Sequence, residues 1–210
     1  MGLYFNRIPK FIRSAIPGIL WDQRSNKNII YLTFDDGPHP DVTPEVLDIL
    51  ENYQAQATFF CLGQQLEKYP DLAMQMIKRG HKIGNHTYSH LNGWRTPVSQ
   101  YLEDVELCQS IMNKLGLPDY FLFRPPYGKI SLQQFLKLRS KYYIVLWSYM
   151  TGDFDPNLTV KLLKDRVMKC VNGGDIVVFH DGENTINSLP NHLPEILNHF
   201  SQQGFEFSVL

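Results

Sequence analysis

Two adjacent carboxylates at the end of an apolar run are the residues of this chain whose type and position most suggest chemistry. Residues 28–34 are rich in β-branched and aromatic side chains, which predicts a strand buried on both faces. The run ends at Asp35 and Asp36, and Gly37-Pro38 then turns the chain. Because consecutive side chains of a strand point to opposite faces, the two carboxylates should diverge. On this stretch alone, a catalytic site and an ordinary Asp-Gly turn both remain open.

Two histidines four residues apart are candidate metal ligands. His86 and His90 would lie on one face of the chain if the intervening loop made a helical turn. Histidines at this spacing are also common on surfaces, but with one carboxylate they complete a two-histidine, one-carboxylate set. Such a set suits Zn²⁺ and, less specifically, Fe²⁺, Co²⁺ or Ni²⁺. One aspartate as a ligand would leave the other available as a general base.

Three more polar residues follow predicted strands. Arg124 is suited to hold a carboxylate through paired hydrogen bonds, with an ordinary surface ion pair as the alternative. His180 ends an apolar run, and an imidazole can protonate a leaving amine near neutral pH. The alternative for His180 is a buried histidine with satisfied hydrogen bonds. Asp153 lies a few residues beyond the predicted fifth strand.

Seven short apolar segments, separated mostly by helical segments, predict a parallel α/β sheet in a single domain. The strands are expected at residues 29–34, 57–61, 81–85, 121–123, 142–147, 176–179 and 205–209. Helices are expected after Thr43 and Ser131, both as N-caps, and over residues 70–77, 99–115, 158–171 and 190–201. Seven units favour a barrel over an open sheet, although the pattern alone does not decide. In a parallel barrel the strand ends share one rim, so the polar residues named above should converge on one site.

Composition limits the class of protein. The 210 residues are 43% hydrophobic with a net charge of −1, which predicts one globular domain and gives no support for a nucleic-acid partner. Three widely spaced cysteines form neither a disulfide framework nor a paired metal motif.

The basic, aromatic segment 1–21 has neither the features of a signal peptide nor an apolar stretch long enough to span a bilayer. We expect it to pack on its own domain, although its amphipathic character would also allow peripheral contact with a membrane. The chain is therefore expected in the cytoplasm, with contact with the inner face of the membrane as an open alternative.

Four motifs resemble, in order, those of the polysaccharide deacetylases, the NodB-homology domain of carbohydrate esterase family 4. They are residues 33–37 (TFDDG), 86–90 (HTYSH), 124–128 (RPPYG) and 176–181 (IVVFHD). The resemblance extends from about Ile29 to the C-terminus. It implies a distorted (β/α)7 barrel, with a catalytic domain over 29–210 and an N-terminal extension over 1–28 that packs on the barrel.

The resemblance also implies roles for individual residues. Asp35 resembles the catalytic base, and Arg124 resembles the residue that orients this base. The metal ligands would be Asp36, His86 and His90.

Further roles concern the substrate. The backbone N–H of Tyr127 resembles an oxyanion-hole donor, and Val178 stands where a leucine usually shapes the acetyl pocket. His180 resembles the general acid, and Asp153 the acid that holds and tunes this histidine.

The chain departs from the family at the motif after the fifth predicted strand. Met150 replaces the first acid of that motif, and Phe154 replaces a tryptophan of the groove wall. These changes affect the polarity of the groove and its substrate preference. Trp94, Tyr127, Trp147 and Phe154 are candidate stacking faces for sugar rings, although aromatic residues near a barrel rim often serve packing alone.

The resemblance implies a metal-dependent hydrolase that removes the N-acetyl group of an N-acetylhexosamine in a glycan or a lipid-linked saccharide. Zn²⁺ is the expected cofactor, with Co²⁺ or Ni²⁺ as alternatives. Other activities left open are a deformylase or an O-deacetylase on a related sugar. A silent carbohydrate-binding module is a further alternative, but it has no need of a complete set of base, ligands and acid.

Overall fold

The computed structural model describes residues 6–210, so residues 1–5 of the predicted N-terminal extension lie outside the described residues. The first elements are α1 (Lys10–Ala15), β1 (Ile19–Leu20), β2 (Ile29–Asp35), α2 (Thr43–Asn52), β3 (Ala57–Cys61), α3 (Gly63–Lys68), α4 (Pro70–Lys78), β4 (Lys82–Asn85) and α5 (Val98–Lys114). They are followed by β5 (Leu122–Phe123), η1 (Pro126–Gly128), α6 (Leu132–Leu138), β6 (Tyr143–Val145), β7 (Tyr149–Met150), α7 (Val160–Cys170), β8 (Ile176–His180), η2 (Glu183–Thr185), α8 (Leu189–Gln202) and β9 (Glu206–Phe207).

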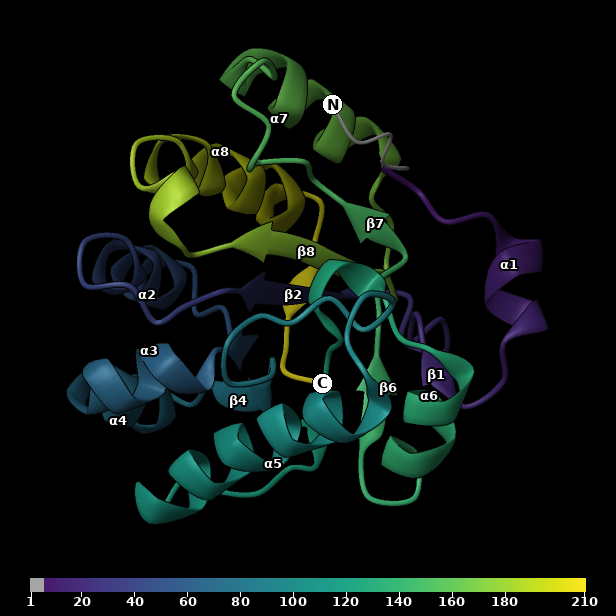
Figure 1. The fold of residues 1–210 in the computed structure, drawn as a ribbon. Helices are drawn as coiled ribbons and strands as arrows, with labels where there is room; N and C mark the ends of the chain where they lie inside the picture. Colours follow the sequence, from purple (N-terminus) through teal and green to yellow (C-terminus); the bar gives the residue numbers. More distant parts are fainter. Residues whose placement is uncertain (1–5) are drawn as a thin grey trace.

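The strands form one curled parallel sheet with helices on its outside (Figure 1). Their order is β1-β6-β5-β4-β3-β2-β8-β7, and β9 pairs with the start of β2. At the β7 edge, residues 6–8 run antiparallel to the strand, with a bridge between Arg7 and Tyr149. The predicted α/β fold with a parallel, barrel-like sheet is confirmed.

Strand β2 is the centre of the sheet. It lies between β3 and β8, and all its residues except Ile29 are buried. On one face, the Phe34 ring stacks on Phe59 at 4.9 Å and on Phe179 at 5.7 Å, so three neighbouring strands share one aromatic layer. Burial on both faces explains the continuous apolar sequence before the two aspartates.

The sequence analysis missed two strands of the sheet. β1 lies within the predicted N-terminal extension, and its Ile19 and Leu20 pair with β6. β7 follows only three residues after β6, so no turn signal separates the two strands in the sequence. The predicted strand at 205–209 exists as β9, but it extends the sheet only at the start of β2. The domain boundary after residue 28 remains a prediction.

The two predicted N-caps differ in outcome. Ser131 caps α6 in a capping box with Gln134, as expected. Thr43 was predicted wrongly, because it is the first residue of α2 and its hydroxyl caps no helical N–H. Instead its Oγ1 accepts a hydrogen bond from the His39 N–H at 2.8 Å and donates one to Asp181 Oδ2 at 2.7 Å.

No helix within residues 6–210 combines the length and apolar character needed to cross a bilayer.

Candidate active site and metal centre

The polar residues that follow the strands meet at one rim of the sheet. Asp35 and His180 are register partners at the ends of β2 and β8, and His86 directly follows β4. Arg124 follows β5 and reaches Asp35, while Asp153 follows β7 and reaches His180. The predicted convergence of five separate segments is therefore confirmed.

The two aspartates diverge, as the strand geometry predicts. Asp35 is the last residue of β2, whereas Asp36 has a φ of 81°, in the left-handed region. This conformation is unusual for a residue with a side chain, and it re-aims the Asp36 carboxylate away from that of Asp35. Asp35 consequently binds Arg124, whereas Asp36 lies closest to His90.

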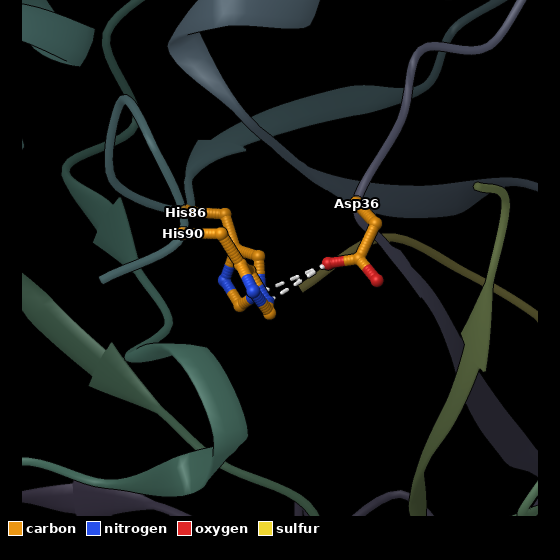
Figure 2. A group of neighbouring side chains, drawn as sticks. All are labelled: Asp36, His86 and His90. Carbon is orange, nitrogen blue, oxygen red and sulfur yellow. Dashed lines mark ion pairs between the residues drawn. The ribbon is translucent and has the colours of Figure 1, made fainter. Parts of the chain in front are cut away.

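Asp36, His86 and His90 form a group whose ligand atoms converge (Figure 2). Asp36 Oδ1 lies 3.1 Å from His90 Nε2 and 3.5 Å from His86 Nε2. It is buried and accepts no hydrogen bond from a described residue. Ligands about 2.1 Å from a tetrahedral Zn²⁺ lie roughly 3.4 Å apart, so this donor set fits such an ion.

The second nitrogen of each histidine is held by the protein. His86 Nδ1 lies 2.7 Å from the Arg124 carbonyl oxygen, so Nδ1 carries the proton and Nε2 presents a lone pair. His90 Nδ1 lies 3.1 Å from the hydroxyl of Tyr127. Such outer contacts fix the orientation of a metal-binding imidazole.

The loop between the histidines does not form a helical turn, which was the condition for the two side chains to share one face. Thr87 and His90 have φ values of 65° and 61°. The Asp104 carboxylate of α5 accepts the backbone N–H groups of Tyr88 and Ser89 and the Ser89 hydroxyl, at 2.7–3.0 Å. This carboxylate therefore holds the loop between the two imidazoles, and the spacing of the histidines in the sequence does not reveal it.

Charge and burial favour the ligand forms of these side chains. Burial lowers the pKa of His86 to about 4, which leaves the ring neutral at pH 7. Burial alone would raise the pKa of Asp36, but its close contact with His90 and the nearby imidazoles of His180 and His86 bring this pKa below its usual value. A neutral imidazole and an ionised carboxylate are the forms that bind a metal.

Arg124 is completely buried and fixes Asp35. Its Nη1 donates to Asp35 Oδ1 at 2.7 Å and to Thr33 Oγ1 at 2.8 Å. The remaining donors reach the carbonyl oxygens of Val145 and Leu146. The predicted paired hydrogen bonds between Arg124 and one carboxylate are not formed. Only Nη1 donates to Asp35, because the other nitrogens of the guanidinium donate to carbonyl oxygens of Val145 and Leu146.

His180 and Asp153 form a second pair, in which Asp153 is buried and His180 is partly exposed. His180 Nδ1 lies 2.8 Å from Asp153 Oδ1, and the His180 backbone N–H donates to Asp153 Oδ2 at 2.7 Å. Burial alone would lower the pKa of His180, but the Asp153 carboxylate outweighs burial and raises it to about 9. The ring is thus cationic at neutral pH, with Nε2 as its remaining donor.

A cavity of about 530 Å³ lies over these groups. Of the predicted substrate residues, Tyr127, Trp147 and Phe154 line it, as does Met150. Trp147 is only 8% exposed, whereas Phe154 sets its ring edge-on to His180 at 5.1 Å.

Two other predicted residues lie outside the lining of this cavity. Trp94 is 68% exposed beside it, and Val178 is fully buried in β8. The assignment of Val178 to an acetyl pocket stays a prediction.

Asp181 is a buried carboxyl group that the sequence analysis did not identify as a site residue. Its N–H donates to the Asp35 carbonyl oxygen, and its Oδ2 accepts from Thr43. A Cβ at Gly37 would lie 2.2 Å from Oδ2, so the turn after the two aspartates requires glycine. Burial raises the pKa of Asp181 to about 7. Its place as the last residue of the motif at 176–181 is the signal that could have indicated this position.

The family model described as polysaccharide deacetylase matches residues 22–144. The chain belongs to the polysaccharide deacetylase family. A peptidoglycan-N-acetylglucosamine deacetylase of Bacillus cereus is 37% identical over 191 residues, which cover 90% of this chain and 89% of that protein. A chitooligosaccharide deacetylase of Azorhizobium caulinodans is 35% identical over 160 residues, 75% of each chain.

A solved polysaccharide deacetylase shares the whole fold. The crystal structure of the Bc1960 peptidoglycan N-acetylglucosamine deacetylase superposes with a TM-score of 0.88 at 30% identity, and the match covers 95% of this chain and 94% of that one. The curled sheet and its rim are therefore those of the polysaccharide deacetylases.

The buried Arg124–Asp35 pair predicts a large loss of stability in Arg124→Met. The variant leaves the Asp35 carboxylate buried without a cation, which should cost about 3–5 kcal/mol in the free energy of unfolding, measured in urea. Arg79→Met is the control, because Arg79 pairs with Asp48 at the surface and should change stability by no more than about 1 kcal/mol. Equal losses of unfolding free energy in the two variants would show that the buried pair contributes no more to stability than a surface pair.

The convergent donor set predicts metal binding by this rim. His86→Ala removes one of three ligands, so its affinity for Zn²⁺ in calorimetric titration should fall by more than about 100-fold. His199→Ala, which alters a histidine on α8, is the control and should bind Zn²⁺ like the unaltered protein. Unchanged affinity in His86→Ala would place the metal elsewhere.

Proposed function

We propose that this chain is a Zn²⁺-dependent N-deacetylase that acts on N-acetylhexosamine units of peptidoglycan or of its lipid-linked precursor. The observation that carries the proposal is the division between the two adjacent aspartates. Asp36 converges with two histidines, while Asp35 lines the same cavity but is bound by Arg124. The relatives named as peptidoglycan deacetylases support the substrate class.

Asp36, His86 and His90 would hold the metal in this proposal. A divalent ion held there would supply Lewis acidity to the acetamide carbonyl and to a nearby water. Zn²⁺ is favoured because two imidazoles and one carboxylate leave a tetrahedral position open. Co²⁺ and Ni²⁺ are the alternatives that the same donors accept.

Asp35 would act as the general base. Its Oδ1 is occupied by Arg124, and its Oδ2 lies 4.0 Å from His86 Nε2, on the side of the metal ligands. The free oxygen can accept a proton from the attacking water, and the guanidinium keeps the carboxylate from turning away. The backbone N–H of Tyr127 would donate to the oxyanion that forms on the acetamide oxygen.

His180 would act as the general acid. Asp153 binds both its backbone and its ring, so the imidazolium is fixed with Nε2 available to the cavity. As the carbon–nitrogen bond breaks, His180 gives this proton to the departing sugar amine. The products are then acetate and a free amine on the sugar.

A cytoplasmic location, with the N-terminal segment against the inner face of the membrane, is a further proposal that rests on the sequence. It would bring the chain to the lipid-linked precursor rather than to the assembled polymer. Cell fractionation with an antibody against the chain tests it, and recovery only outside the cytoplasmic membrane would contradict it.

The proposed function predicts metal-restored release of both acetate and amine. Chelated protein supplied with Zn²⁺ should deacetylate N-acetylglucosamine oligomers and peptidoglycan fragments, and Asp35→Asn should lower turnover by about 10²–10⁴-fold while it retains Zn²⁺. Asp41→Asn, an exposed acid of the same loop, is the control. Near-normal turnover by Asp35→Asn would show that Asp35 is not the base, and acetate without amine would indicate O-deacetylation.

The His180–Asp153 pair predicts the alkaline limit of activity. His180 must be protonated to act, and its pKa is raised to about 9, so kcat/KM should fall as the pH rises through about 9. Asp153→Asn removes the main cause of the increase, and burial then lowers the pKa of His180. The pH at which kcat/KM falls on the alkaline side, called the alkaline limb, should therefore be lower by about two units in this variant.

The matched control for this pH profile is Asp165→Asn, at an exposed position on α7. It should keep the alkaline limb of the unaltered protein. A limb that stays in place in Asp153→Asn would exclude His180 as the titrating acid.

A further inference from the structure

The cavity over the metal ligands extends in two directions, and each side carries one lysine. Lys129 lines the part that contains Tyr127 and Trp147. Lys68 lines a second part, of about 400 Å³, together with Glu183. The Lys68 side therefore contains a carboxylate that offsets its charge. On the Lys129 side, Asp35 and Asp36 are the only lining carboxylates among the described residues, and both are committed to partners.

Lys129 is half-buried and is placed by its neighbours. Its Nζ lies 5.4 Å from the centroid of the Trp94 ring and 5.8 Å from that of Tyr127. Aromatic faces at this distance attract an ammonium group without neutralising it. Among residues 6–210, Lys129 forms no ion pair. A half-buried cation at a substrate cavity is thus left without an anion.

The two rings are fixed before any substrate arrives. The Trp94 indole N–H donates to the Ile130 carbonyl oxygen at 3.1 Å, and the Tyr127 hydroxyl contacts His90. The loop that carries Trp94 packs closely on the Lys129 backbone, because a Cβ at Gly93 would lie 2.4 Å from the Lys129 carbonyl oxygen. Yet Trp94 and Tyr127 remain 68% and 56% exposed. They present two open aromatic faces with a cation between them.

We propose that Lys129, with Trp94 and Tyr127, forms a subsite for an anionic group that is attached to the deacetylated N-acetylhexosamine or to the sugar next to it. The aromatic faces would pack on the sugar ring, and the ammonium group would donate to the anion. This inference rests on the proposed function and deepens it, since it selects anionic glycans over neutral ones. The anionic oxygen is a carboxylate of a muramyl residue or a phosphate of a precursor, which share this chemistry.

The test compares three substrates of the Zn²⁺-loaded full chain. Chitotetraose is neutral, a stem-free tetrasaccharide of alternating N-acetylglucosamine and N-acetylmuramic acid carries carboxylates, and UDP-N-acetylglucosamine carries a pyrophosphate. The readout is the ratio of kcat/KM for each anionic substrate to kcat/KM for chitotetraose. Lys129→Met should lower the ratio for the preferred anion about tenfold, because it removes one charged hydrogen bond.

Controls separate charge from packing. Lys129→Arg should keep the preference, and Lys137→Met, at an exposed position on α6, should keep it as well. Added salt should reduce the ratio in the unaltered protein but not in Lys129→Met. If Lys129→Met lowers the ratio only for the tetrasaccharide, the anion that binds Lys129 is a carboxylate. If it lowers the ratio only for the nucleotide sugar, the anion is a phosphate.

Two failures are distinguishable. If chitotetraose is deacetylated but neither ratio changes in Lys129→Met, the subsite is wrong and the proposed function stands. If none of the three substrates releases acetate with Zn²⁺ present, the proposed function is overturned and the subsite with it.

Discussion

The buried contact between Arg124 and Asp35 is the constraint on which the rest of the site depends. A fully buried guanidinium is tolerated only if its donors are satisfied and a carboxylate balances its charge. Here the donors reach the ends of β2 and β6, and the balancing carboxylate is the last residue of β2. One side chain thus joins three strands, since Arg124 itself follows β5. It also faces the Phe60 ring of β3, with Cζ 4.1 Å from the ring centroid.

This contact gives two acids that are adjacent in sequence different surroundings. With Asp35 held by Arg124, the left-handed backbone of Asp36 turns the second carboxylate towards the histidines. The Arg124 carbonyl oxygen in turn sets the tautomer of His86, so the same residue orients the proposed base and one proposed metal ligand. On the other side of β2, the Asp153 carboxylate places and charges His180. The proposed base, metal ligands and acid are therefore positioned by contacts that leave each of them little freedom.

Much of this arrangement could be predicted from the sequence, because parallel strands bring their carboxyl ends to one rim. The order of the motifs and the apolar runs before Asp35 and His180 were sufficient to predict the fold class and the convergence. The sequence did not reveal contacts between residues far apart in the chain. Asp104 shapes the loop between the histidines from a helix that follows it, and Thr43 bridges to Asp181 across 138 positions instead of capping its helix. Short strands such as β1 and β7 have too few residues to show a pattern.

Anomalous diffraction from crystals of the Zn²⁺-loaded protein would test the division between the two aspartates most directly. We expect one strong anomalous peak, from a Zn²⁺ ion bound by Asp36, His86 and His90. Asp35 should keep its hydrogen bond to Arg124 and should not bind the ion. A peak bonded to Asp35, or a site in which Asp36 has turned away from the histidines, would contradict this division.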